Sequence, residues 1–147
     1  GECRSSEVMD MLQAMNTGHK GSLTTIHANT PRDALARIEN LIGMSGMVLP
    51  PKALREQITS AVDIIVQVSR LADGSRKIVR INEITGMEGD IITSQDIFAF
   101  EMSGTGPKGE VLGKFRPTGV RPIFAERIEK YGIDLRPGMF NPDPDED

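Results

Sequence analysis

The chain has 147 residues, 38% of them hydrophobic, and a formal net charge of −4, which suits one ordinary domain or a large piece of a bigger one. A single cysteine, Cys3, excludes an internal disulfide, and no run approaches the roughly 20 apolar residues of a transmembrane helix. Aromatic residues make up only 4%, tryptophan is absent and no basic stripe occurs, so the composition gives no support to nucleic-acid binding.

The start of the chain predicts a helix followed by a strand. Ser5 and Ser6 can cap a helix whose apolar residues recur at i, i+3, i+4 and i+7, and Gly18 is expected to end it. The apolar residues of this helix are Val8, Met11, Leu12 and Met15. Residues 22–26, Ser-Leu-Thr-Thr-Ile, follow a glycine and are rich in β-branched side chains, which predicts a short strand.

Two further helices are expected before residue 63. Thr30 caps the first of them, Pro31 takes its first helical position, and Asp33 occupies the capping-box site. Gly43 is expected to stop this helix, and a Pro-Pro pair at 50–51 opens the next one. The residues predicted to face the core are Leu35, Ile38, Leu41 and Ile42 in the first helix and Leu54, Ile58, Ala61 and Val62 in the second.

The pattern then becomes β-rich. Residues 64–68 are typical of a strand, Asp73-Gly74 is a strong hairpin turn, and residues 77–84 alternate as the returning strand. The remaining predicted elements are β runs at 91–93 and 97–100, a Gly-rich stretch at 103–110, a strand at 111–115 and a helix at 122–131 stopped by Gly132.

Glu2 and His27 are the residues best placed to carry chemistry. If Glu2 ends one strand, the segment to residue 26 completes a strand–helix–strand unit with parallel strands and a right-handed crossover. Both strands then end at the same sheet edge, where open α/β sheets bind ligands. There a carboxylate can hold a magnesium-bound water, and a histidine can donate to a phosphate oxygen. The alternative without a function is that Glu2 is merely exposed and that His27 has its hydrogen bonds satisfied at a strand end.

Two segments resemble a known family. Gly1-Glu2-Cys3-Arg4 resembles the end of the Walker B segment of the type II/type IV secretion ATPases. Residues 18–30, Gly-His-Lys-Gly-Ser-Leu-Thr-Thr-Ile-His-Ala-Asn-Thr, resemble the histidine box of the same proteins. Residues 12–19 and 31–35 are most similar to the CpaF-type branch, whose members drive Tad/Flp pilus assembly. The resemblance covers about the first two thirds of the chain and, more loosely, the last helix.

The resemblance implies an α/β fold, the C-terminal part of a RecA-like P-loop ATPase domain with parallel strands and helices, followed by a β-hairpin-rich segment and a terminal helix. The expected boundaries are 1–63 for the core part, 64–121 for the β-rich segment, 122–140 for the terminal helix and its extension, and 141–147 for an acidic, disordered tail. Since the chain opens without methionine, we expect a truncated or processed piece of a longer protein.

The resemblance also implies roles for individual residues. Glu2 matches the Walker B acid, which acts on magnesium indirectly, through a bound water, and His27 matches the box histidine near the γ-phosphate. His19 matches the first histidine of the box, and packing at the turn is an equal alternative to catalysis for it. Arg4 and Arg32 are candidates for sensing nucleotide or for bridging to another subunit, although a solvated face is the favoured interpretation of Arg32.

A phosphate-binding loop of the form G-x-x-x-x-G-K-[ST] does not occur in the 147 residues. The nearest stretch is 109–115, Gly-Glu-Val-Leu-Gly-Lys-Phe, which has one spacer too few and a phenylalanine in place of the hydroxyl residue. It is predicted to form a β-turn and a strand. ATP and Mg²⁺ are therefore expected as cofactors of the intact parent protein, and tight binding by these residues alone is not expected.

Three kinds of function compete. The parent is expected to be a hexameric ATPase that powers type IV/Tad pilus assembly or type II/IV secretion, cytoplasmic and peripheral to the inner membrane, with platform or secretion proteins as partners and no nucleic acid. A non-catalytic interaction or oligomerisation module is the alternative, and it is favoured for the isolated chain. A metal hydrolase built on Glu2, His19 and His27 is the weakest, because the spacing of the histidines matches no helical zinc motif.

Overall fold

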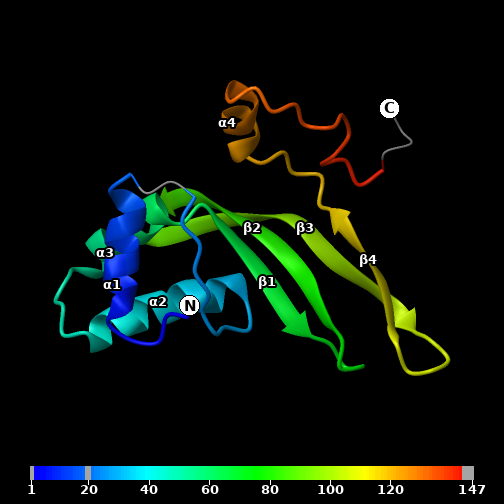
Figure 1. Cartoon of the computed structure of the whole chain (residues 1–147), viewed down its shortest axis with the longest axis horizontal. Helices are drawn as coiled ribbons and strands as arrows, with labels where there is room; N and C mark the ends of the chain where they lie inside the picture. The colour runs from blue at the N-terminus through cyan, green and yellow to red at the C-terminus, as the bar shows by residue number, and fades with distance from the viewer. Residues whose placement is uncertain (1, 19–20, 144–147) are drawn as a thin grey trace. The chain divides into compact units, whose positions relative to one another are not determined.

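A computed structural model describes residues 2–18 and 21–143 (Figure 1). The elements of this part are α1 (Glu7–Asn16), α2 (Pro31–Met44), α3 (Pro51–Ala61), β1 (Ile64–Arg70), β2 (Arg76–Glu88), β3 (Ile91–Thr105), β4 (Val111–Pro117) and α4 (Phe124–Lys130). Two compact units share them. The first unit contains Gly1–Asp63 and Ile84–Ser94, and the second contains Ile64–Glu83 and Gln95–Asp147. None of the helices just named is long and apolar enough to span a bilayer.

Three helices, α1, α2 and α3, pack around one apolar core in the first unit (Figure 1). Two polar contacts tie them together: Asn16 donates to the carbonyl of Gln57 at 3.3 Å, and Arg55 Nε lies 2.6 Å from Glu39 Oε1. Most of the buried side chains follow the helical period that the sequence predicts, whereas Met11, Met15, Ala61 and Val62 are only half-buried. The buried side chains are Val8, Met9 and Leu12 of α1, Ala34, Leu35, Ile38, Leu41 and Ile42 of α2, and Leu54 and Ile58 of α3.

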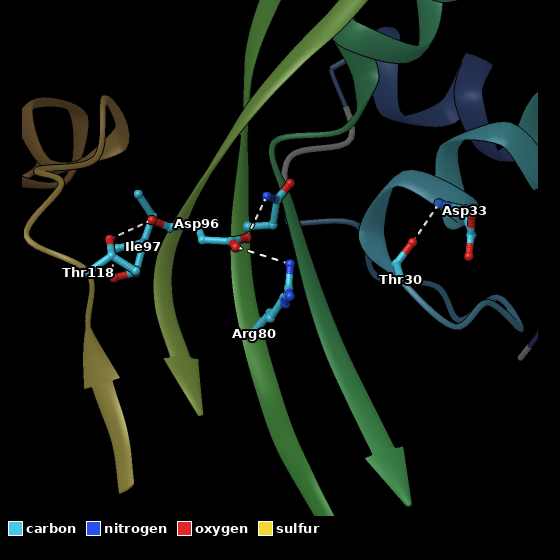
Figure 2. A network of polar contacts seen from close by, with 7 residues as sticks. Thr30, Asp33, Arg80, Asp96, Ile97 and Thr118 are labelled. Carbon is cyan, nitrogen blue, oxygen red and sulfur yellow. Dashed lines mark hydrogen bonds and ion pairs between the residues drawn. The ribbon is translucent and has the colours of Figure 1, made fainter. Parts of the chain in front are cut away.

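The cap at the start of α2 is confirmed, because the Thr30 hydroxyl accepts a hydrogen bond from the Asp33 amide at 3.1 Å (Figure 2). The predicted stop at Gly43 is wrong. The helix runs to Met44, and its end falls where the Ser45 hydroxyl donates to the Ile42 carbonyl at 2.6 Å. Gly46 follows with a φ of 80°, the left-handed conformation that glycine allows, so it is this glycine that ends the helix.

The predicted strand at residues 22–26 is wrong as a strand. In its place the chain makes one isolated parallel bridge, between Glu2 and Thr25, with the Cys3 amide donating to the Thr25 carbonyl at 2.9 Å. A single bridge is all that forms because no further strand flanks this pair among residues 2–18 and 21–143. The parallel strands expected of a RecA-like core are therefore not part of the structure that these residues show.

The sheet is antiparallel, with strand order β1-β2-β3-β4. Arg70 pairs with Arg76 beside the first hairpin turn, and Thr105 pairs with Val111 beside the last one. The stretch that looked like a defective phosphate loop is the predicted turn and strand, since β4 begins at Val111. A Cβ at position 113 would lie 2.6 Å from the Phe100 ring, which explains the glycine there.

One strand, β3, is longer than predicted. The two β runs expected at 91–93 and 97–100 form a single strand, Ile91–Thr105, which includes three polar residues, Ser94, Gln95 and Asp96, between the runs. The side chains of Gln95 and Asp96 hydrogen-bond to β2, so the polar residues continue the strand instead of interrupting it.

The chain after β4 packs on the sheet within the second unit. The core there consists of Ile97, Ala125 and Phe140, with Phe98, Val120, Phe124 and Leu135 packed against it. The helix predicted at 122–131 is shorter, Phe124–Lys130, and ends where Gly132 adopts a φ of 76°. Of the acidic tail, residues 141–143 are described, and Arg116 donates to the Pro142 carbonyl at 2.8 Å.

Candidate functional site

The parallel bridge in the first unit brings Glu2 close to His27. Because Glu2 pairs with Thr25, the chain needs only two further residues to reach His27. The Oε1 atom of Glu2 lies 3.8 Å from Nδ1 of His27. This separation is too long for a hydrogen bond and close enough for a charge contact when the imidazole is protonated. The two residues that the topology predicts to face one site therefore lie side by side.

Arg4 holds the other oxygen of the Glu2 carboxylate. Its Nε and Nη2 atoms donate to Oε2 of Glu2 at 3.1 and 2.8 Å. These hydrogen bonds are the main reason that the pKa of Glu2 is lowered. Burial, the next largest effect, raises the pKa, and the charges of Arg4, His27 and Arg37 lower it further. Glu2 is therefore held as an anion, with Oε2 occupied by Arg4 and Oε1 directed toward His27.

The side chains of this group differ in exposure. His27 is 90% exposed and Arg4 is 76% exposed, whereas Glu2 is 28% exposed. The imidazole is thus free to reach a bound molecule, while the carboxylate is held in place by its neighbour. Within the part of the chain that the structure describes, Glu2, Arg4 and His27 form a compact polar group on the surface of the first unit.

The other sequence candidates lie outside this group. His19 is outside the described residues. Arg32, on α2, is exposed and takes part in no ion pair within residues 2–18 and 21–143, as its solvated interpretation predicts. Arg37, further along α2, is also exposed, and its charge helps to lower the pKa of Glu2. Spacing along a helix gives no sign of such proximity, so the sequence offered no signal for it.

The side chain of Cys3 is buried next to the site. Its side chain is 4% exposed, and Sγ lies 3.3 Å from the Thr24 hydroxyl and 3.5 Å from the Met11 sulfur. Between Glu2 and Arg4, this residue therefore packs inward while its neighbours face solvent. These contacts give Cys3 a packing role at the edge of the core.

Polar side chains also meet in the second unit, between β2 and β3 (Figure 2). Asp96 accepts from Asn82 Nδ2 at 2.8 Å and from Arg80 Nη1 at 3.3 Å. Thr118 donates to the Asp96 carbonyl at 2.6 Å, as Figure 2 shows. Since the carboxylate already has two donors from the neighbouring strand, this network fastens strands together and presents no free acid for chemistry.

The fit of a metal ion can be tested on the donor set. Among residues 2–18 and 21–143, no three His, Cys, Asp or Glu side chains are grouped so that they could hold a metal ion. Glu2 offers one carboxylate oxygen that is not held by Arg4. The residues fit a contact to a water of hydrated Mg²⁺ through Glu2, and they do not fit direct coordination.

Known proteins resemble much of this chain. A putative conjugal transfer protein of Mycobacterium tuberculosis (strain ATCC 25618 / H37Rv) is 40% identical over 91 residues, 62% of this chain and 25% of that protein. Conjugal transfer protein TrbB of Rhizobium radiobacter is 39% identical over 89 residues, 60% of this chain and 25% of that protein. Type IV secretion system protein PtlH of Bordetella pertussis is 39% identical over 80 residues, 52% of this chain and 23% of that protein.

The chain thus spans no more than 25% of the length of these relatives. The description "Type II/IV secretion system protein" belongs to a family model that matches residues 1–106. This match covers the three helices, the polar group at Glu2 and all of β1, β2 and β3. It confirms the resemblance that the sequence suggested: the chain belongs to the type II/IV secretion system protein family.

Proposed function

We propose that this chain contributes the acid and the histidine of a nucleotide site in a secretion-system ATPase of RecA-like fold. The observation that carries the proposal is the 3.8 Å separation between Glu2 Oε1 and His27 Nδ1, held by the bridge from Glu2 to Thr25. Membership of the secretion family supports it, because the matched residues include both side chains. The phosphate loop that such a site needs is not within these 147 residues.

Each residue has a distinct proposed task. A bound Mg²⁺–ATP would supply the phosphoryl group that is transferred to water. Glu2, kept anionic by Arg4, accepts hydrogen bonds from water at the site and orients it. The exposed His27 imidazole donates to a phosphate oxygen and stabilises negative charge there.

Arg4 is a positioning residue in this proposal. Its two hydrogen bonds fix the Glu2 side chain in one orientation, so that only Oε1 remains directed toward His27. Arg32 and His19 remain candidates for contacts with nucleotide or with a neighbouring subunit.

The larger assembly is also part of the proposal. We infer that the parent protein is a homo-oligomer, a hexameric ring of the CpaF type serving Tad or type IV pilus assembly or secretion. Its expected place is cytoplasmic, at the inner membrane beside platform or secretion proteins. The names of the relatives, which refer to conjugal transfer and type IV secretion, support a role in transfer or secretion.

The test is Mg²⁺-dependent ATP hydrolysis by the longer protein that contains this chain. His27→Ala and Glu2→Gln are each expected to lower kcat by about 100-fold or more with little change in KM, because both act mainly on the transition state. Asn40→Ala and Glu56→Gln, at exposed positions of α2 and α3, are matched controls that should leave kcat unchanged.

The same assay separates the alternative function. If the longer protein hydrolyses ATP and the His27 and Glu2 variants match the controls, the assigned roles are wrong. A non-catalytic interaction module would then be the better description of this chain. The isolated 147-residue chain is expected to show no turnover above background, and robust Mg²⁺-dependent turnover by it would contradict the incomplete site.

A further inference from the structure

Two hairpin tips lie together at one end of the sheet in the second unit (Figure 1). We define the tips as residues 68–78, around the β1–β2 turn, and 102–115, around the β3–β4 turn. Asp73 in the first tip accepts a hydrogen bond from the Val111 amide of the second at 2.8 Å. The tips are therefore held as one surface, although they are separate in sequence.

The acids of this surface are satisfied by hydrogen bonds within it. Asp73 also accepts from the Ser75 amide at 2.9 Å and from the Ser75 hydroxyl at 2.6 Å. Glu110 accepts from the Lys108 amide at 2.8 Å. Both carboxylates thus bind neutral donors of the turns, and neither forms an ion pair with a base among the described residues.

The bases of the tips are exposed and lack ion-pair partners within residues 2–18 and 21–143. Glu101, the cross-strand neighbour of Lys114, pairs with Arg116 at 3.5 Å. Five bases and two acids give the tips a charge of +3, which leaves −7 on the rest of a chain whose net charge is −4. The bases are Arg70, Arg76, Lys77, Lys108 and Lys114.

Exposed apolar side chains stand among these bases. Met102 is 59% exposed, Leu112 is 45% exposed and Phe115 is 42% exposed. In the other tip, Val68 and Ile78, which pair across the strands, are 54% and 46% exposed. Lys77 extends over the Phe100 ring at 5.8 Å. A surface that combines unpaired bases with apolar side chains suits the boundary between lipid headgroups and acyl chains.

We propose that the two tips bind end-on to the surface of an anionic phospholipid bilayer. Successive residues of a strand face opposite sides, so Arg76 and Lys77 project from both faces of the sheet, and an end-on approach is the one that presents both. Lysines make up three of the five bases, and lysine is depleted in protein–protein interfaces, which favours lipid over an acidic protein. The inference rests on the second unit and not on the nucleotide site, and it names a surface for the membrane-peripheral location proposed above.

The test is cosedimentation of the 147-residue chain with vesicles. The chain is expected to bind vesicles of phosphatidylcholine mixed with phosphatidylglycerol, to ignore phosphatidylcholine alone, and to dissociate as salt is raised. Lys108→Glu combined with Lys114→Glu should weaken binding by about tenfold or more, since each base near the surface contributes on its own. The matched control is Lys52→Glu combined with Lys130→Glu, which makes the same change in net charge elsewhere and should retain binding.

A second variant keeps the test independent of charge. Leu112→Ser leaves every charge in place and should weaken binding to the anionic vesicles severalfold, with far-UV circular dichroism confirming the fold. Equal losses in the tip and control variants, or no binding to anionic vesicles by the unaltered chain, would overturn the proposal. Tighter binding to polyglutamate-coated beads than to anionic vesicles would overturn it in favour of an acidic protein. ATP hydrolysis by the tip variant of the longer protein should be unchanged, so that failure of this inference and of the nucleotide site are distinguishable.

Discussion

The carboxylate of Glu83 accepts a hydrogen bond from the backbone amide of Phe124 at 2.9 Å. The same side chain accepts from the Ile123 amide and from Gln95 Nε2, each at 2.9 Å, and it is only 4% exposed. Two donors from the start of α4 and one from β3 thus meet a buried acid on β2. The segment that follows β4 is fastened to the sheet at this point.

Glu83→Ala should be among the most destabilising changes in the second unit. It leaves three buried donors without an acceptor, and the free energy of unfolding should fall by about 2–4 kcal/mol. Urea denaturation measures the change. Glu101→Ala is the control, because that exposed glutamate on β3 makes one ion pair at 3.5 Å and should alter stability by less than about 1 kcal/mol. Similar losses in both variants would mean that the Glu83 contacts contribute little.

Ile97→Ala tests the core beneath α4. The side chain is fully buried beside Ala125 and Phe140, so its truncation leaves a cavity and should cost about 2–5 kcal/mol. Thermal or urea unfolding followed by circular dichroism gives the measurement. Ile91→Ala, at a β3 position that is 60% exposed, should cost far less, and equal costs at the two positions would contradict the placement of this core.

Arg4→Met should raise the pKa of Glu2, because it removes the hydrogen bonds that lower it most. The folded-state pKa of Glu2 lies below its ordinary 4.5, so its contribution to stability is present above pH 4.5 and is lost as the pH falls through the lowered value. Carboxyl-carbon NMR titration reports the pKa directly. Arg32→Met removes an equal charge from α2 and should change the pKa of Glu2 little. A larger shift of this pKa in Arg32→Met than in Arg4→Met would contradict the placement of Arg4 beside Glu2.

Asp73→Asn should weaken the contact between the two hairpin tips, and the stability lost in this variant should depend on pH. The Ser75 hydroxyl, followed by the Val111 and Ser75 amides, lowers the pKa of Asp73 from 3.8 to about 2. The stabilisation that this lowered value represents is present above pH 3.8 and is lost as the pH falls toward 2. The difference in unfolding free energy between the unaltered chain and the variant should therefore be largest near neutral pH and shrink at acid pH. Asp134→Asn, which lies at an exposed position, should show no such trend.

The sequence predicted the helices well because their signals are local. The apolar periodicity of α2 and the Thr30 cap depend on residues within a few positions of one another, and the structure has both. The β-turn at Gly109 and the strand from Val111 were predicted for the same reason. The pairing of Glu2 with His27 was also expected, since the order of a strand, a helix and a second strand brings their ends together.

Features that depend on distant partners were harder to predict. The polar residues 94–96 were predicted to interrupt β3. Nothing in the sequence shows that Asn82 and Glu83 of β2 lie opposite and hydrogen-bond to Asp96 and Gln95. Residues 22–26 have the composition of a strand, but in the part of the chain that the structure describes they form an isolated bridge to Glu2 and no named strand. Propensity describes a residue's fitness for a strand, whereas a strand exists only where a neighbour supplies hydrogen bonds.

The segments of the two compact units alternate along the chain, which limits where the protein can be truncated. The first unit ends at Asp63 and resumes at Ile84–Ser94, so a truncation after residue 63 removes part of the unit that it is meant to isolate. Lost with it would be the hydrogen bond from the Ile84 amide to the Asp63 carbonyl at 2.9 Å and the one from Arg55 to the Asp90 carbonyl at 2.9 Å. A chimera of two family members would therefore need residues 1–63 and 84–94 to come from the same parent. A single crossover point between α3 and β1 would instead combine residues 1–63 of one parent with residues 84–94 of the other.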